Sequence, residues 1–397
     1  MTTSQKSTDA LSASFAPRLL TWFHQFGRHD LPWQYHHKPE ADIYAVWLSE
    51  IMLQQTQVAT VLGYFGRFLE KFPTVQALAA ADWQDVATLW AGLGYYARAR
   101  NLHAGAKQVA DFIDKNGHFP QTLDEWQAVR GVGRSTAGAI VAMGVRDFGV
   151  ICDGNVKRVL TRHRAIGDDI TKSATDKALW ELATLLTPQT DSGKYAQAMM
   201  DLGATICTRT RPKCDICPVA SDCQARQLGR QTDFPVKKKA AAKPHRHSLV
   251  ISLIHNDRTL WLHRHNDGGI WDGLWCLPMM ALDYGGDGEL SVENLQNLLE
   301  KAWQNSANDS TQSVAQSLAE SQLMTTLDLP IITQPIKRIK HTLTHFHWHL
   351  YHLSIRIDDA VTAQIDDKLR AIHAEFVWCV GSQTLAKPAA MVKLLQG

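Results

Sequence analysis

Four cysteines form the group of residues whose spacing says most about chemistry. They are Cys207, Cys214, Cys217 and Cys223, spaced C-x6-C-x2-C-x5-C. Four thiolates within one short loop can hold a single metal centre, and this asymmetric spacing favours a [4Fe–4S] cluster bound by four cysteines. A zinc site is the alternative, because thiolates also suit zinc.

Two carboxylic acids lie in surroundings where an acid is costly. Glu50 follows Trp47 by three residues and borders the apolar stripe of an expected helix, where its pKa would rise and let it donate a proton near neutrality. Asp153 stands in a stretch that is otherwise apolar or basic, which suits a carboxylate facing developing positive charge. Plainer interpretations stay open, with Glu50 at a helix edge and Asp153 as a helix N-cap.

A glycine turn separates two expected helices, at residues 122–129 and 135–143. Gly131 and Gly133 lie in this turn, directly before the second helix. Backbone N–H groups at such a helix start bind phosphate, helped by the helix dipole. The pattern is that of a helix-hairpin-helix.

A second glycine turn precedes paired tyrosines at residues 92–96, with cations after it. Exposed aromatic rings there would suit a wedge that enters a duplex after a base has left the stack. Core aromatics under a loop explain the same pattern equally well.

The bulk composition describes an ordinary globular protein. The chain has 397 residues, 45% of them hydrophobic and 20% charged, which predicts two or three domains. The net charge of +2 is too small to argue for DNA binding, but basic residues gather at 98–107, 157–164 and 237–246. No apolar run is long enough to span a membrane, and the start lacks the features of a secretory signal.

Cysteine usage outside the quartet bears on the compartment. Cys152, Cys276 and Cys379 show no pairing pattern, so we expect no disulfides and a reducing, cytoplasmic location.

The chain divides by periodicity and composition. Residues 1–14 are polar and are expected to form a disordered tail, and residues 15–230 show helical spacing throughout. Residues 231–247 contain two prolines and a lysine run and predict a basic interdomain linker. From residue 248 to 397 the pattern is α+β, and residues 304–325 are expected to be partly mobile.

Individual elements of this C-terminal part can also be predicted. Alternating apolar residues indicate strands at 248–254, 259–263 and 347–356. A helix capped by Ser291 is expected to run to Trp303.

Together these segments resemble the helix-hairpin-helix superfamily of DNA glycosylases and, within it, the MutY-type family that excises adenine. The segments that carry the resemblance are Leu31–Gln34, Trp47–Val58, Gly92–Leu102, Gly131–Gly138, Asp153–Val159, Gln197–Gly203 and the four cysteines. The resemblance implies a six-helix module at about 32–146, an iron–sulfur module formed by 15–31 and 147–230, and a Nudix-like domain at 248–397 that recognises 8-oxoguanine.

The resemblance also implies an activity and roles for particular residues. The activity is hydrolysis of adenine from double-stranded DNA in which it is mispaired with 8-oxoguanine or guanine, by a monomer. Glu50 matches the general acid, Asp153 the carboxylate that stabilises the oxocarbenium ion, and Asn155 a residue that orients the site. Residues that match substrate or DNA contacts are Arg28, Trp33, Gln54, Tyr95, Arg98, Gly131, Gly133, Ser135, Leu343, Thr344 and His345.

One position separates this expectation from its nearest rival. Endonuclease III-type relatives, which also cut the DNA strand, carry a lysine where this chain has Ser135, and a hydroxyl cannot form an imine with the sugar aldehyde. The sequence therefore predicts a monofunctional enzyme that leaves an abasic site. A non-catalytic iron–sulfur DNA-binding module is a further alternative, which the pair of acids disfavours.

The chain departs from the family pattern at two places. Arg130 stands where proline usually precedes the hairpin glycine, and Leu343-Thr344-His345 replaces a Phe-Ser-His loop thought to read 8-oxoguanine. The helix at 291–303 lacks the Arg-Glu-x-x-Glu-Glu pattern that holds magnesium in Nudix hydrolases, so pyrophosphatase activity is not expected.

Overall fold

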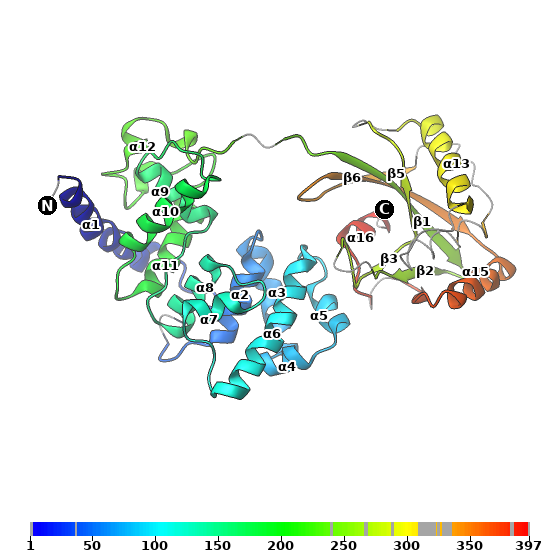
Figure 1. Cartoon of the computed structure of the whole chain (residues 1–397), viewed down its shortest axis with the longest axis horizontal. Coiled ribbons are helices and arrows are strands. Elements are labelled where there is room, and N and C mark those ends of the chain that lie inside the picture. Colours follow the sequence, from blue (N-terminus) through cyan, green and yellow to red (C-terminus); the bar gives the residue numbers. More distant parts are fainter. Residues whose placement is uncertain are drawn as a thin grey trace. The chain divides into compact units, whose positions relative to one another are not determined.

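The computed structural model describes residues 3–35, 38–238, 241–265, 269–286, 290–308, 323, 326–327, 336–381 and 385–395. The chain forms two compact units (Figure 1). The first comprises Met1–Ala80 and Arg100–Ala240, and the second comprises Ala81–Ala99 and Ala241–Gly397. No helix in the described part of the chain combines the length and apolar character that a membrane span needs.

The first unit is helical. Its α-helices are α1 (Thr3–Phe26), α2 (Ile43–Leu53), α3 (Val58–Lys71), α4 (Val75–Ala80), most of α6 (Tyr96–Asn116), α7 (Leu123–Ala128), α8 (Arg134–Ile140), α9 (Gly154–His163), α10 (Ser173–Leu186), α11 (Ser192–Asp201) and α12 (Gln224–Gln227). Two π-helical turns, η1 (Val141–Val145) and η2 (Leu202–Ile206), prolong α8 and α11. Short 3-10 turns lie at η3 (Cys214–Ile216) and η4 (Gln231–Asp233).

Two groups of helices make up this unit. Helix α2 packs on α3 and α8, and its Trp47 lies against Trp126 of α7, with ring centroids 5.6 Å apart. Helices α1, α9, α10 and α11 share a second core, in which Phe15, Leu19 and Phe23 of α1 are fully buried. Such burial of aromatic and leucine side chains is the main favourable term that holds the helices together.

The second unit holds helix α5 (Trp83–Trp90) and a mixed sheet. Its described strands are β1 (His245–His255), β2 (Arg258–His263), β3 (Trp275–Cys276), β4 (Met279–Leu282), β5 (Lys337–Thr342), β6 (His347–Arg356) and β7 (Phe376–Cys379). The sheet order is β3-β2-β1-β6-β5, with β4 added to β1 and β7 to β2. Strands β1 and β6 are parallel, and the other pairs are antiparallel.

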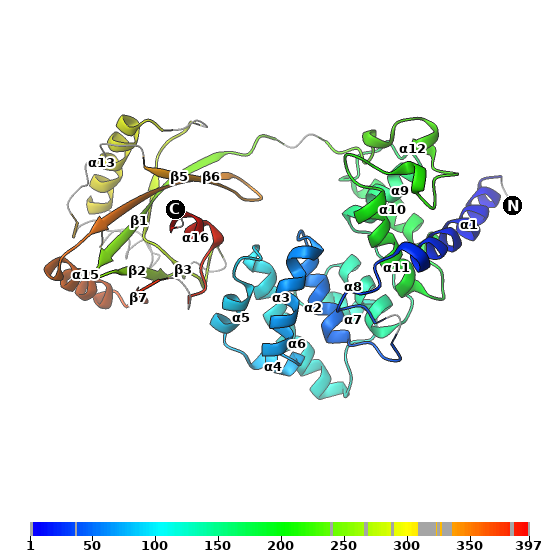
Figure 2. The same cartoon turned by 180° about the vertical axis from the view of Figure 1, so that it is seen from behind.

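Helices α13 (Val292–Asn308) and α15 (Asp359–Ala371) cover one face of this sheet, as Figures 1 and 2 show from opposite sides. Alternate residues of β1, Leu249, Ile251 and Leu253, point into the core that these helices close. A short helix, α16 (Ala389–Leu395), packs against β5.

Several expectations about this architecture differ from the structure. Helix α1 begins at Thr3 and so includes most of residues 1–14, for which a disordered tail was expected. The linker expected at 231–247 ends earlier, because β1 begins at His245 and continues its pairing with β6 from that residue.

Three further expectations concern the linker, the helix after Ser291 and residues 304–325. The Lys238 N–H donates to Asp169 Oδ2 at 3.1 Å, which attaches this stretch to the helical unit. The Ser291 hydroxyl caps the helix after it, accepting from Asn294 N at 3.1 Å. Most of residues 304–325 lie outside the described residues.

Candidate active site

Glu50 lies on α2, whose first turn is capped by the Asp42 side chain accepting from Ala45 N at 3.0 Å. Its neighbours Trp47, Leu48 and Ile51 are almost completely buried, whereas Glu50 is half-buried. Burial raises the pKa of Glu50 to about 8, and the nearby Asp153 carboxylate adds to this rise. Glu50 is therefore largely protonated at neutral pH and can act as an acid.

Asp153 is the N-cap of α9. Its Oδ1 accepts from Asn155 N at 3.0 Å and from Val156 N at 2.8 Å. The cap interpretation is correct, and it also fixes the direction of the carboxylate, because both bonds go to one oxygen and leave Oδ2 outside the cap. The N-cap role of Asp153 is therefore compatible with a functional role for its carboxylate.

The segment before Asp153 is pressed against α8. A Cβ added to Gly138 would lie 1.9 Å from Val150 O, and one added to Gly149 would lie 2.2 Å from Gly138 O. Ser135 Oγ accepts from Cys152 N at 3.0 Å. The helix that follows the hairpin therefore positions the chain that delivers Asp153, through backbone contacts that leave no room for side chains.

Asn155 is held from the other side by Arg158. Arg158 Nη2 donates to Asn155 Oδ1 at 2.9 Å and to Gly203 O at 2.8 Å, and its Nε donates to Cys207 O at 2.8 Å. The sequence singled out Arg158 only as part of a basic stretch. Its three bonds instead connect the first cysteine of the quartet with the residues after Asp153.

The two glycines of the hairpin turn differ in backbone conformation and in the space around them. Gly131 has φ +84°, and a Cβ there would lie 2.6 Å from the Asn101 Cβ, so this position requires glycine. Gly133 is the N-cap of α8 at φ −86°, and a Cβ there would meet nothing within 4 Å. The Arg130 N–H, which a proline would lack, donates to Gln108 Oε1 at 2.7 Å. Gly133 thus leaves open space in front of the helix start.

The turn at Gly92–Tyr95 displays one aromatic ring. Gly92, Gly94 and Tyr95 all have positive φ, and Tyr95 is 53% exposed. The Arg98 guanidinium lies 5.6 Å from the Trp90 ring centroid and 5.3 Å from that of Tyr95, and donates to the Gly94 carbonyl at 3.3 Å. Arg98 is only 8% exposed, and its cation holds the turn from below. Gln54, at the C-terminal end of α2, is half-buried.

Trp33 lies at a cavity of about 470 Å³ in the helical unit. Trp33 lines it together with Met143, Arg146, Lys194 and Gln197, whereas neither Arg28, Glu50 nor Asp153 is among the described lining residues. Arg28 instead makes a two-point ion pair with the buried Asp201, with Nε donating to Oδ1 at 2.8 Å. The sequence did not identify Asp201 as the partner of this arginine.

The cysteine quartet lines one pocket. Cys207, Cys214, Cys217 and Cys223 surround a mostly apolar space with Val159 and Ile206. Burial raises the pKa of Cys217 to about 12, and the three other cysteines contribute to this rise because they lie close to it. Arg162 donates to Cys207 Sγ at 3.4 Å. Four sulfur donors in one pocket fit a metal centre of the kind that the spacing predicts.

Leu343, Thr344 and His345 form the turn between β5 and β6. The Leu343 N–H donates to Phe346 O at 2.9 Å, and Lys243 Nζ donates to Leu343 O at 2.7 Å. Thr344 and His345 are exposed at the tip, whereas Phe346 is buried under the Arg246 guanidinium, 4.1 Å from its ring centroid. Leu343 supplies no aromatic ring, but Phe346, three residues later, does. Its buried ring anchors the turn.

Comparisons with known proteins agree with this geometry. Residues 48–184 match a family described as HhH-GPD superfamily base excision DNA repair protein, and residues 249–397 match a NUDIX domain. The chain is similar to a solved structure of a thermostable thymine-DNA glycosylase, with a TM-score of 0.50 and 26% identity over 56% of this chain and 99% of that one. Fold and site therefore define a helix-hairpin-helix DNA glycosylase, an enzyme of base excision repair.

Two relatives narrow the class further. The adenine DNA glycosylase of Buchnera aphidicola subsp. Acyrthosiphon pisum (strain APS) is 36% identical over 290 residues, which are 72% of this chain and 81% of that protein. The adenine DNA glycosylase of Homo sapiens is 45% identical over 236 residues, 58% of this chain and 43% of that protein. The chain belongs to the adenine DNA glycosylase family.

Proposed function

We propose that this enzyme removes adenine mispaired with 8-oxoguanine or guanine in double-stranded DNA and leaves an abasic site. The observation that carries the proposal is the pair of acids: a largely protonated Glu50 beside Asp153, whose direction is fixed by its cap. A proton-donating carboxyl group next to a second carboxylic acid is the arrangement that hydrolysis of a glycosidic bond requires.

Each acid has one role in the proposed reaction. Adenine is a poor leaving group as an anion, so Glu50 donates a proton to its N7 and lets it depart neutral. The sugar then acquires oxocarbenium character, and the ionised Asp153 stabilises the positive charge. Asn155, held by Arg158, keeps the residues around Asp153 in place. Water then completes the hydrolysis at the sugar carbon.

DNA binding in this proposal uses three separate features. The open N-terminal end of α8 at Gly133 binds a backbone phosphate, since its first N–H groups point outward. The exposed Tyr95 ring, with Gln54, fills the space that the extruded adenine leaves in the stack. Thr344 and His345 at the β5–β6 turn contact 8-oxoguanine. Trp33 and its cavity contribute to holding the base, with Arg28 steadied by Asp201.

We assign the cysteine quartet a [4Fe–4S] cluster. Cys207, Cys214, Cys217 and Cys223 would hold it, and the bound cluster would supply a rigid, redox-capable centre that takes no part in releasing the base. The Cys207 carbonyl accepts from Arg158, so the shape of this loop bears on Asn155. A monomer acting on DNA in the cytoplasm is the assembly and location that we propose.

Replacing Glu50 tests the proposal directly. Glu50→Gln keeps the shape of the side chain but cannot supply the proton, so single-turnover release of adenine from an A:8-oxoguanine duplex should fall by about 10²–10⁴-fold. Binding to the same duplex should persist. The matched control is Glu70→Gln, on the exposed side of α3. Release at the wild-type rate by Glu50→Gln would reject the assignment of the acid.

A further inference from the structure

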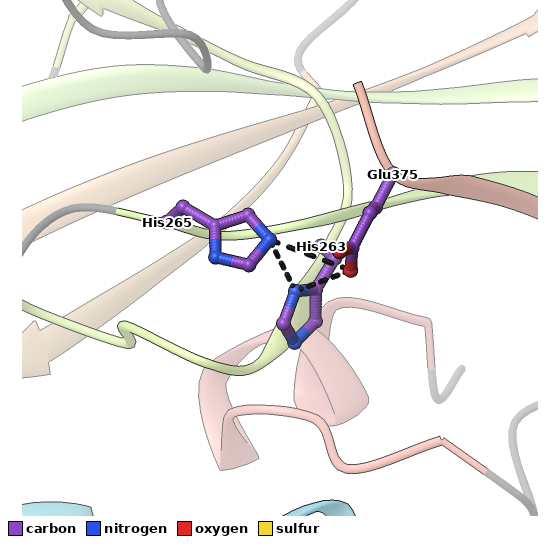
Figure 3. A group of neighbouring side chains, drawn as sticks. All are labelled: His263, His265 and Glu375. Atoms are coloured by element: carbon purple, nitrogen blue, oxygen red, sulfur yellow. Dashed lines mark hydrogen bonds and ion pairs between the residues drawn. The ribbon is translucent and has the colours of Figure 1, made fainter. Parts of the chain in front are cut away.

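Three potential metal ligands meet at the end of β2, far from the acids and from the cysteine quartet in the sequence. His263 is the last residue of β2, and its N–H donates to Glu375 O at 2.9 Å across the β2–β7 pair. The chain stays extended after β2, because Arg264 N donates to Leu274 O at 2.9 Å. His265 therefore lies on the same side of the chain as His263, with Glu375 beside both (Figure 3).

Their ligand atoms form a closed triangle. His263 Nδ1 lies 2.8 Å from His265 Nε2 and 2.9 Å from Glu375 Oε2, and His265 Nε2 lies 3.4 Å from the same oxygen. The ring centroids of the two histidines are 4.4 Å apart, with the rings nearly perpendicular. All three side chains thus direct one lone-pair atom toward a common point, as Figure 3 shows.

With neutral rings, hydrogen bonds satisfy this triangle only in part. If His263 Nδ1 carries a proton, Glu375 Oε2 and His265 Nε2 must share it, and the lone pairs of these two acceptors face each other at 3.4 Å. If it accepts from His265 instead, its lone pair faces the carboxylate oxygen at 2.9 Å. One edge of the triangle is unfavourable in either arrangement with neutral rings, and a central cation removes the conflict because all three atoms can then donate lone pairs to it.

The size of the triangle suits a small divalent metal. Its circumscribed circle has a radius of about 1.8 Å, so a point about 2.0–2.1 Å from all three atoms exists about 1 Å outside their plane, and that is the bond length of zinc to imidazole and carboxylate. His265 and Glu375 are 56% and 59% exposed, so water can complete the coordination.

The other ring nitrogen of His263 is also in contact with the protein. The His263 side chain is only 9% exposed, and its Nε2 lies 2.7 Å from Gln84 Nε2, which also donates to Gly273 O at 3.1 Å. This contact helps to fix the orientation of the ring whose Nδ1 faces His265 and Glu375.

We propose that His263, His265 and Glu375 bind one zinc(II) ion, with water as the fourth ligand. The ion would join the end of β2 to the residue before β7 and so fasten this edge of the sheet. The site belongs to the second unit and uses none of the residues assigned to base release, so the proposal stands independently of the proposed function.

Zinc binding by the full-length protein with its cysteine centre intact tests the site. One equivalent of zinc chloride should bind, measured by competition with a chromophoric chelator, and zinc-edge X-ray absorption should show nitrogen and oxygen neighbours at about 2.0–2.1 Å. His265→Ala and Glu375→Gln should each weaken binding by about tenfold or more. His255→Ala is the matched control, because His255 pairs with a single carboxylate, that of Asp359, at 2.7 Å.

The possible results are distinct. Both replaced side chains are more than half exposed, so the variants should keep the wild-type melting temperature without zinc. Unchanged affinity in His265→Ala, or no binding by the wild type, would overturn the proposal. Sulfur neighbours at about 2.3 Å would do the same, because the zinc would then be in the cysteine quartet.

Discussion

The Ser135 hydroxyl accepts a hydrogen bond from the backbone N–H of Cys152 at 3.0 Å, one residue before Asp153. The position that corresponds to the expected lysine of lyase-type relatives therefore supports the chain that holds Asp153. Ser135 thus helps to place Asp153, at the position where the monofunctional mechanism that we propose calls for a residue other than lysine.

Substitutions at Ser135 should separate these two effects. Ser135→Ala leaves the Cys152 N–H without its acceptor, which should cost about 1–3 kcal/mol of stability and slow base release. Ser135→Lys restores an amine, so borohydride should trap a covalent complex with abasic duplex DNA, whereas the wild type should give none. Trapping by the wild type would contradict the monofunctional mechanism.

The rate of base release should depend on the protonation of Glu50. With a pKa of about 8, the single-turnover rate constant should vary little from pH 6 to 7 and fall about tenfold per pH unit well above 8. The residual rate of Glu50→Gln should lack this decline. A wild-type profile that falls with a midpoint near pH 4.5 would show that Glu50 titrates as an ordinary carboxyl group.

The stability of the fold should also depend on pH through the protonation of Glu50. In the unfolded chain Glu50 ionises near its ordinary pKa of 4.5, whereas in the folded state it holds its proton to about 8. Its contribution is therefore fully present below about pH 4.5 and is lost as the pH rises toward 8. Urea unfolding between these two pH values should show that the free energy of unfolding of the wild type falls progressively relative to that of Glu50→Gln.

The two hairpin glycines should respond differently to alanine. Gly131→Ala combines a positive φ with a contact of 2.6 Å to Asn101, so it should lower stability by about 1–3 kcal/mol. Gly133→Ala meets no atom of the protein within 4 Å and should change stability by less than about 0.5 kcal/mol. It should nevertheless weaken duplex binding several-fold, since the methyl group occupies the phosphate position. Unchanged binding would remove the phosphate role from this turn.

The tip of the β5–β6 turn should control the choice between 8-oxoguanine and guanine. His345→Ala removes an exposed side chain, so the melting temperature should stay constant while the ratio of excision rates on A:8-oxoguanine and A:G duplexes falls. Leu343→Phe should raise that ratio by adding a ring to the same turn. His24→Ala, at an exposed position of α1, provides the control, and a constant ratio in both turn variants would exclude the loop from recognition.

Local patterns predicted the parts of the structure that depend on nearby residues. The spacing of the cysteines, the cap at Asp153 and the alternation along β1, β2 and β6 each lie within a few residues of the chain. Strands β3, β4 and β7 have two to four residues each, too few for a periodic signal.

Features set by distant parts of the chain were not predictable. Burial of Arg98 depends on how the Gly92–Tyr95 turn closes over it, and the pairing of Arg28 with Asp201 depends on how α11 packs. The zinc ligands come together only because β2 pairs with β7, so His263 and Glu375 show no spacing signal in the sequence.

The anchoring of the β5–β6 turn by Phe346 has a consequence for how this protein can diversify. Because the buried ring and the Leu343–Phe346 hydrogen bond hold the turn, Thr344 and His345 contribute little to folding. Variation at these two positions is thus nearly free of structural penalty, and selection could redirect the domain toward another damaged base by changing a few exposed atoms.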